Sequence, residues 1–265
     1  MNDTRVGVVG ESSETIVQAV DDTSATLVED PFSDPTFVIA VGEAALYSLI
    51  PDAPAPVLPV ETGTPGLNPV SRENVPVVLS DLLDEPQLHS RIQSQPHSQS
   101  QSQSQTHTKD RSHVSSRSQL TVSHPVIGID RPDGMVYALI DVLLLTSEQA
   151  RISEYTVMTG DEPIASVRAD GIVVATPAGS HGYAHDAGGP HIAPETAVGS
   201  VVPIAPFSVT HNHWVLSLSD IRLTIERDDA AVELLVDGRS VGTVPYTDTL
   251  RLKPVSAIET IRTNK

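Results

Sequence analysis

The sequence contains no cysteine among its 265 residues. This absence excludes a disulfide framework, a thiolate metal site and a cysteine nucleophile, and it is compatible with a cytosolic protein. Lysine is scarce as well, because the 16 basic residues comprise 13 arginines and only Lys109, Lys253 and Lys265. Against 34 acidic residues they leave a formal net charge of -18.

The excess of acidic residues limits the partners that the protein can bind and indicates the environment in which it works. A strongly negative surface repels nucleic acid and anionic membranes, so we expect neither as a partner. The acidity could be a surface property without a binding role, or an adaptation to high salt, where self-repulsion is screened. The shortage of lysine favours the second interpretation and predicts a halophilic, archaeal cytoplasm. Any nucleotide site in such a protein must rely on backbone donors or arginines.

Long apolar runs are missing too. The most apolar window, residues 37–50, is interrupted by Glu43 and is too short to span a bilayer. The N-terminus lacks a basic start followed by an apolar core, so no export signal is expected. We therefore expect a soluble, cytoplasmic protein.

Residues 1–89 alternate between strand-like and helix-like patterns. Strands are predicted at 5–10, 25–28, 37–41 and 57–60, and helices at 14–20, 43–50 and 77–83. This order predicts a small Rossmann-like α/β domain with a parallel sheet covered on both faces. Residues 90–121 are rich in Ser and Gln with few apolar side chains, which predicts a disordered insertion.

After residue 122 the pattern becomes that of short strands without a convincing helix. The run from Met135 to Leu145 is expected to form one of them, and Asp133-Gly134 and Asp237-Gly238 are hairpin signals. We predict an antiparallel β-sandwich over residues 122–250. Residues 251–265 form a C-terminal segment that returns to the N-terminal domain.

The most distinctive stretch is DGIVVATPAGSHGYAHDAGGP, residues 170–190, which holds five glycines. So many glycines around one strand indicate close approach of the backbone to a ligand or to another chain segment. The histidines in and after this stretch raise the alternative of a metal site. A regular helix is improbable there and the spacings match no closed metal set, so we expect no metal and interpret them as exposed or ligand-facing side chains. These histidines are His181, His185, His191, His211 and His213.

This stretch resembles the signature of the NAD kinase (ATP-NAD kinase) family, approximately DGxxxSTPTGSTAYxxSAGGP. Eleven positions match in order without a gap, and the chain is similar to a divergent, haloarchaeal member of that family. The matching positions are Asp170, Gly171, Thr176, Pro177, Gly179, Ser180, Tyr183, Ala187, Gly188, Gly189 and Pro190. The continuation at residues 201–206 is similar to the family's PIxPH strand, and Asp237-Gly238-Arg239 to its DGQ turn.

The resemblance implies an α/β domain followed by a β domain, and transfer of the terminal phosphate of ATP to the 2′-hydroxyl of the adenosine ribose in NAD. It implies NAD or NADP in the cleft between the domains, ATP and Mg²⁺ if the protein is active, and a homo-oligomer paired through the β domains. It also implies a set of dinucleotide-binding residues: Gly42, Asp141, Thr176, Gly179, Ser180, His181, Tyr183, Asp186, Gly188 and Gly189.

The chain departs from the family pattern at the loop that serves catalysis. Where the family has GGDGT after a strand, Gly42 fits the first glycine, Glu43 replaces the second, and Ala44 stands at the position of the aspartate. Ile140-Asp141 retains only the acid of the family's Asn-Asp or Asn-Glu pair.

These departures leave two hypotheses. One is an NAD kinase-like protein that binds the dinucleotide but has reduced or lost kinase activity, with Asp141 or Glu43 as the catalytic acid if it is active. The other is a non-catalytic regulatory or interaction protein that binds an adenylate or associates with a true NAD kinase.

Overall fold

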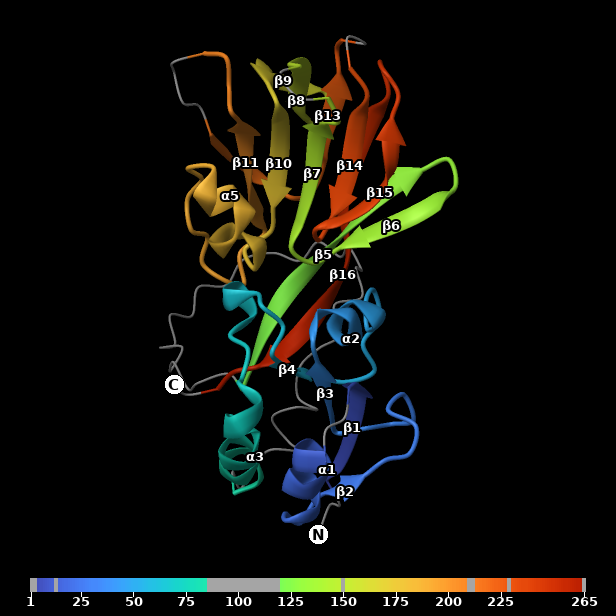
Figure 1. Ribbon diagram of the computed structural model, residues 1–265, viewed down its shortest axis with the longest axis vertical. Coiled ribbons are helices and arrows are strands. Elements are labelled where there is room, and N and C mark those ends of the chain that lie inside the picture. Colours follow the sequence, from blue (N-terminus) through green and yellow to red (C-terminus); the bar gives the residue numbers. More distant parts are fainter. Residues whose placement is uncertain are drawn as a thin grey trace, which may run out of the picture.

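The computed structural model describes residues 4–11, 14–84, 120–148, 151–208, 213–227 and 230–263. The predicted Ser/Gln-rich insertion therefore lies almost wholly outside the described residues. Of the helices in the described ranges, none is long and apolar enough to cross a lipid bilayer. Figure 1 shows an α/β part in blue and teal below a β part in green to red.

The α/β part is built on four parallel strands in the order β2-β1-β3-β4. All five residues of the central strand β3 are buried, as expected for a parallel strand covered on both faces. One face packs against α1 and α3, and the other packs against α2. The elements are β1 (Arg5–Gly10), α1 (Glu14–Asp21), β2 (Thr26–Leu27), β3 (Phe37–Val41), α2 (Glu43–Ser48), β4 (Val57–Val60), the 3-10 turns η1 (Pro65–Leu67) and η2 (Arg72–Asn74), and α3 (Val75–Leu83).

The β part is a sandwich of two sheets around a continuous apolar core. One sheet has six strands in the order β12-β11-β10-β7-β14-β15, and the other contains β5, β6, β8, β9, β13 and β16. The predicted α/β plus β-sandwich fold is confirmed. The elements are β5 (Thr121–Arg131), β6 (Gly134–Ala138), β7 (Asp141–Thr146), β8 (Ser153–Thr159), β9 (Glu162–Ala169), β10 (Gly171–Ala175), η3 (Gly179–His181), α5 (Tyr183–Asp186), β11 (Val198–Ile204), β12 (Trp214–Ser217), β13 (Ile221–Ile225), β14 (Val232–Val236), β15 (Arg239–Val244) and β16 (Thr249–Ile261).

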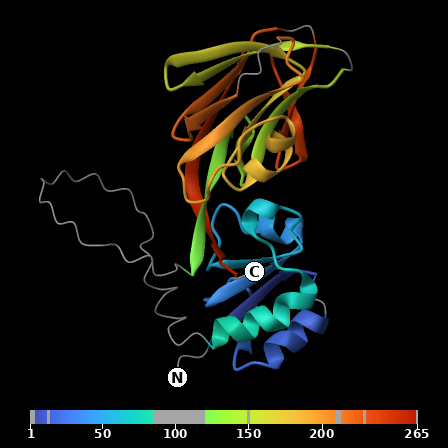
Figure 2. The ribbon, with the colours of Figure 1, turned by 90° about the vertical axis from the view of Figure 1, so that its left-hand side faces the viewer.

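The long strand β16 joins the two parts. It pairs with β13 in the sandwich, with β5 along most of its length, and in parallel with β4 through Thr260 and Val57. The second sheet therefore continues into the parallel sheet as one ten-stranded sheet. Figure 2 shows the green and red strands running from the sandwich down into the α/β part.

Sequence patterns missed β16 because Lys253 and Pro254 interrupt its alternation. Proline cannot donate a ladder hydrogen bond and is normally confined to strand edges or bulges. In the structure the register shifts between Pro254 and Ser256, so the proline lies at a bulge. There the hydroxyl of Ser256 donates to the carbonyl of Pro51 at 2.6 Å, which ties the bulge to the α/β part.

The apolar run from Met135 to Leu145 forms two strands, so its prediction as one strand was wrong. β6 belongs to the sheet of β5, whereas β7 belongs to the six-stranded sheet. The chain crosses between them at Leu139 and Ile140, both of which are buried. Because the turn is itself apolar, no polar or glycine residue marks it in the sequence.

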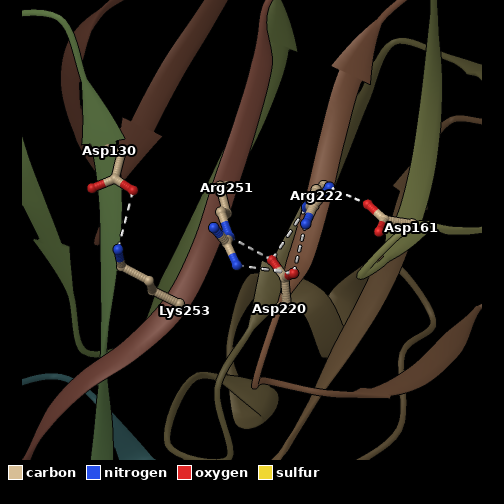
Figure 3. Close-up of polar contacts among 6 residues, drawn as sticks. All are labelled: Asp130, Asp161, Asp220, Arg222, Arg251 and Lys253. Carbon is tan, nitrogen blue, oxygen red and sulfur yellow. Dashed lines mark hydrogen bonds and ion pairs between the residues drawn. The ribbon is translucent and has the colours of Figure 1, made fainter.

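The outer face of the larger sheet carries a charged network (Figure 3). Arg222 and Arg251 are directly opposite each other on β13 and β16, an arrangement that like charges make unfavourable. Asp220 relieves it by accepting hydrogen bonds from both guanidinium groups, from 2.7 to 3.3 Å. These bonds from Arg222 and then Arg251 lower the pKa of Asp220 to about 2. Beside them Lys253 donates to Asp130 at 3.2 Å.

Candidate functional site

The start of β7 and the end of β10 bring Asp141 next to the glycine-rich stretch. Asp141 is the register partner of Ala175, and Thr176 follows directly. The backbone N–H of Thr176 donates to the carbonyl of Ile140 at 2.9 Å. Its hydroxyl donates to the carbonyl of Leu139 at 2.7 Å. Thr176 therefore fixes the turn that presents Asp141.

Asp237 supports the same turn from the β14–β15 hairpin. Its carboxylate accepts hydrogen bonds from the backbone N–H groups of Leu139 at 3.0 Å, Ile140 at 2.7 Å and Asp141 at 3.1 Å. Burial raises the pKa of Asp237, although these three donors and then Arg239 act in the opposite direction. The Asp237-Gly238 turn of this chain is therefore a structural support for the crossing between the sheets.

Asp141 itself is half-buried. Burial raises the pKa of its carboxyl to about 6, and the negative charge of Asp237 adds to the shift. A carboxyl group that titrates near neutral pH can exchange a proton with a substrate hydroxyl, which is the property of a general base.

The N-terminus of α2 faces this region from the α/β part. Gly42 precedes the helix with φ 83°, a conformation that favours glycine. The exposed Glu43 extends over Gly63, where a Cβ would lie only 2.8 Å from Glu43 Oε1. Ala44 presents an exposed methyl group, so the position that the resemblance assigns to an aspartate carries no ionisable group.

Tyr47, one turn further along α2, links these carboxylates. Burial raises the pKa of its phenol, and the charges of Asp237, Glu43 and Asp141 raise it further, with Arg239 opposing them. The two predicted catalytic residues, Glu43 and Asp141, come from different halves of the chain and both act on this side chain. The fold thus gathers them at the boundary between the α/β part and the sandwich.

The glycines of the 170–190 stretch have a structural explanation. A Cβ at Gly179 would lie 2.0 Å from the carbonyl oxygen of Ile140, and one at Gly189 would lie 2.7 Å from that of Ala184. Gly188 has φ 92°, which L side chains rarely adopt. Of the two partners that the sequence allowed, a ligand or another chain segment, the segment accounts for Gly179 and Gly189.

Ser180 also holds the loop together. Its buried hydroxyl donates to the carbonyl of Pro177 at 2.8 Å and accepts from the N–H of Ile192 at 2.9 Å. Thr176 and Ser180 thus both use their hydroxyl groups within the protein.

A cavity of about 440 Å³ lies between α5 and the end of β11. Three residues of the predicted dinucleotide set, Tyr183, Asp186 and Gly188, line it together with Ile204 and His213. This second cluster lies beside α5, away from the start of β7, because Ile204 is four residues along β11 from Ser200, the register partner of Ala175. At roughly 3.4 Å per residue that separation is about 14 Å.

His191, which directly follows the stretch, stacks on His185 and makes a tilted ring contact with His181. The ring centroid of His191 lies 4.5 Å from that of His181 and 4.0 Å from that of His185. Burial lowers the pKa of His181, and His191 and then His185 lower it further. Within the described ranges, no three His, Cys, Asp or Glu side chains converge so that they could hold a metal ion. His211 lies outside the described residues.

Comparisons with known proteins agree with this architecture. Residues 139–259 match the family model for the ATP-NAD kinase C-terminal domain. The NAD kinase of Methanosarcina barkeri is 35% identical over 114 residues, which are 43% of this chain and 42% of that protein. The NAD kinase of Methanothermobacter thermautotrophicus is 30% identical over 203 residues, which are 76% of this chain and 60% of that protein. The chain thus spans about half the length of these relatives.

Two solved structures share the fold over nearly the whole chain. An NAD kinase from Archaeoglobus fulgidus in complex with ATP superposes with a TM-score of 0.66 at 20% identity, covering 97% of this chain and 93% of that one. Yeast NADH kinase complexed with NADH gives a TM-score of 0.69 at 16% identity, covering 99% of this chain and 84% of that one.

An α/β part joined to a β-sandwich through shared strands is the fold that this chain has in common with these two solved structures. Over residues 139–259 the chain belongs to the NAD kinase family. The resemblance inferred from residues 170–190 is confirmed, whereas the halophilic, archaeal origin stays a prediction.

Proposed function

We propose that this chain binds NAD or NADP at the boundary of its two parts and that its kinase activity is reduced or lost. Family membership supports the ligand class. The weakened catalysis rests on one observation: Ala44 at the N-terminus of α2 supplies no carboxylate, while Asp141 and Glu43 are the acids gathered nearby.

In the family reaction the 2′-oxygen of the adenosine ribose forms a bond to the terminal phosphorus of ATP, the bond from that phosphorus to the bridging oxygen breaks, and ADP leaves. The hydroxyl proton passes to a carboxylate. Asp141, with a pKa of about 6, is roughly 90% ionised at pH 7 and can accept that proton. Glu43 lies where it would repel incoming phosphates, so we give it the weaker claim to this role.

The dinucleotide would extend from Asp141 toward the cavity beside α5. Tyr183, Asp186 and Gly188 line that cavity and would hold its second half. Gly42, His181 and the hydroxyls of Thr176 and Ser180 act by shaping the loops between the two ends.

ATP and Mg²⁺ are the co-substrates that the family implies. No trio of acids or histidines within the described ranges could by itself hold a metal ion. Any Mg²⁺ would accordingly enter with the ATP phosphates rather than occupy a cage of protein side chains. A homo-oligomer paired through the β parts and a cytoplasmic location belong to the same proposal.

The second candidate, a regulatory protein that binds an adenylate or a true NAD kinase, is favoured by the same Ala44. The decisive experiment incubates the purified chain at high salt with ATP, Mg²⁺ and NAD, follows NADP formation, and titrates NAD and NADP by calorimetry. Turnover that Asp141→Asn abolishes supports the enzyme. Binding without turnover supports the impaired form, and no binding of either dinucleotide overturns the proposal.

A further inference from the structure

A second groove of about 440 Å³ is lined by residues of β6 and β15 and by Tyr47 and Ile50, in and just after α2. Figure 1 shows α2 below these two strands. The α/β part contributes Tyr47 and Ile50 to it, and the sandwich contributes Met135, Tyr137, Arg239 and Ser240. With Val136 and Val241, the lining combines two aromatic rings and four other apolar side chains with a single cation. Neither Asp186 nor the rest of the cavity beside α5 is part of this groove.

Arg239 is held in a defined position in this groove. Its guanidinium carbon lies 4.4 Å from the centroid of the Tyr47 ring, a cation–π geometry. It starts β15 directly after Asp237 and Gly238, which both have positive φ, at 48° and 73°. That turn type is rigid and matches the twist of the strands, so it fixes where the side chain leaves the backbone.

The guanidinium is nonetheless available to a ligand. Its side chain is 54% exposed, and within the described part of the chain its ion-pair partner is Asp237, with Arg239 Nη2 3.9 Å from Asp237 Oδ2. That distance is too long for a hydrogen bond, and the carboxylate already accepts three backbone N–H groups. The planar fork of an arginine suits phosphate oxygens, which can accept two parallel hydrogen bonds.

Arg239 is the positive charge among three nearby carboxylates. Asp237, Glu43 and Asp141 all act on Tyr47 as negative charges, and Arg239 is the cation that opposes them. A polyanion is repelled from three carboxylates unless a positive group meets it first. The resemblance gives the turn as DGQ, so the arginine is a departure of this chain from the family's pattern.

We propose that this groove is the binding site for the phosphoryl-donor nucleotide, with Arg239 as the phosphate receptor. The adenine ring packs on Ile50, Met135 and Tyr137, and the phosphates meet the guanidinium that Tyr47 holds in place. Tyr47 lines the groove and is close enough to Asp141 to respond to its charge, so the terminal phosphate would be directed toward the proposed proton acceptor. This inference rests on the proposed function for the identity of the nucleotide.

Calorimetric titrations with ADP, ATP and adenosine test the groove. Arg239→Gln restores the family's residue and should weaken ADP and ATP binding by about tenfold or more, because a hydrogen bond to a charged group is lost. Adenosine affinity should stay within about twofold of the parent, because only the phosphate contact changes. Arg239→Lys keeps the charge without the fork and should fall between them.

Arg251→Gln is the matched control, because it removes the same charge from an exposed guanidinium on the outer face of the larger sheet. It should leave ADP affinity within about twofold, which excludes a general effect of net charge. Equal losses in Arg239→Gln and Arg251→Gln, unchanged ADP affinity in Arg239→Gln, or no measurable ATP binding by the parent would each overturn the proposal. If Arg239→Gln fails to fold, a loss of ADP affinity in Arg239→Lys supports the proposal and an unchanged affinity overturns it.

These titrations distinguish a failure of the groove proposal from a failure of the proposed function. ATP binding that depends on Arg239, without any binding of NAD or NADP, would support the groove as a nucleotide site and contradict the proposed function. NADP formation that Arg239→Gln does not change, together with unchanged ATP affinity, would support the proposed function and contradict the groove as the nucleotide site.

Discussion

Asp237 accepts a hydrogen bond from the backbone N–H of Ile140 at 2.7 Å, across 97 residues of sequence. Its carboxylate also receives the N–H groups of Leu139 and Asp141, which flank Ile140. One side chain thereby satisfies the backbone of the turn at which the chain crosses between the two sheets. The position of Asp141 depends on it.

Replacing Asp237 by Asn should destabilise the fold by about 2–3 kcal/mol, because an amide offers one acceptor oxygen to three N–H donors and its NH₂ group opposes one of them. Chemical denaturation measures this change. Asp130→Asn is the matched control: the Asp130 side chain is half-exposed and, within the described ranges, its ion-pair partner is Lys253, so less than about 1 kcal/mol is expected. Equal losses in the two variants would show that the buried turn does not depend on the carboxylate.

Restoring a carboxylate at the N-terminus of α2 should raise phosphoryl transfer. Ala44→Asp adds an exposed acid in the first turn of the helix, where the helix dipole also favours negative charge. General-base groups contribute about 10²–10⁴-fold, and we expect at least about a tenfold gain in NADP formation. Ala44→Asn, which has the same shape and no charge, should give none. A variant that binds NAD normally and still shows no gain would mean that catalysis is limited elsewhere.

Asp141 should give a pH dependence with a known sign. Its folded pKa of about 6 lies above the unfolded value of 3.8, so the folded state carries a cost whenever the carboxyl is ionised. Stability from this group therefore rises as the pH falls from about 6 to 4. Asp141→Asn should be more stable than the parent by about 2–3 kcal/mol at pH 7, with the difference vanishing below pH 4. Any turnover should fall below pH 6, and a carboxyl midpoint near pH 4 in an NMR titration would contradict both expectations.

His124 should act in the opposite direction over an overlapping range. It is buried on β5, and its Nε2 lies 2.9 Å from Thr260 Oγ1. Among the residues that the structure describes, its Nδ1 has no hydrogen-bond partner. Burial lowers its pKa from 6.5 to about 4, so the unfolded chain binds the proton first as the pH falls. Stability should drop by about 3 kcal/mol between pH 6.5 and 4.

His124→Gln should remove this component from a denaturation series, whereas His185→Gln, at an exposed position, should retain it. A parent chain with the same pH profile as His124→Gln would rule out the buried imidazole as its cause.

Local patterns predicted most of the fold. The strands at 37–41 and 57–60 match β3 and β4, and the Asp-Gly pairs at 133 and 237 form the expected hairpins. These features depend on near neighbours in the chain. The strand β16 and the turn at Leu139 were missed because their stability comes from distant partners, mainly β5 and β13 for the strand and Asp237 for the turn.

The candidate site could be predicted only in part from the sequence, for the same reason. The motif at 170–190 indicated the family. A glycine, however, shows only that another group approaches the backbone closely, and it does not identify that group. At Gly179 the neighbour is the Ile140 carbonyl, 39 residues earlier in the chain. Arg239 had no signal beyond its departure from a DGQ turn, because its importance comes from Tyr47 on a helix of the other part.

The strand β16 has a mechanical consequence. Because it is hydrogen-bonded to β13 in the sandwich and to β4 in the α/β part, neither part can rotate as a rigid body without bending a strand they share. Motion between the parts is therefore concentrated at the irregular register near Pro254, where the ladder is already interrupted. The same strand couples their unfolding: heat should melt both parts in a single calorimetric transition.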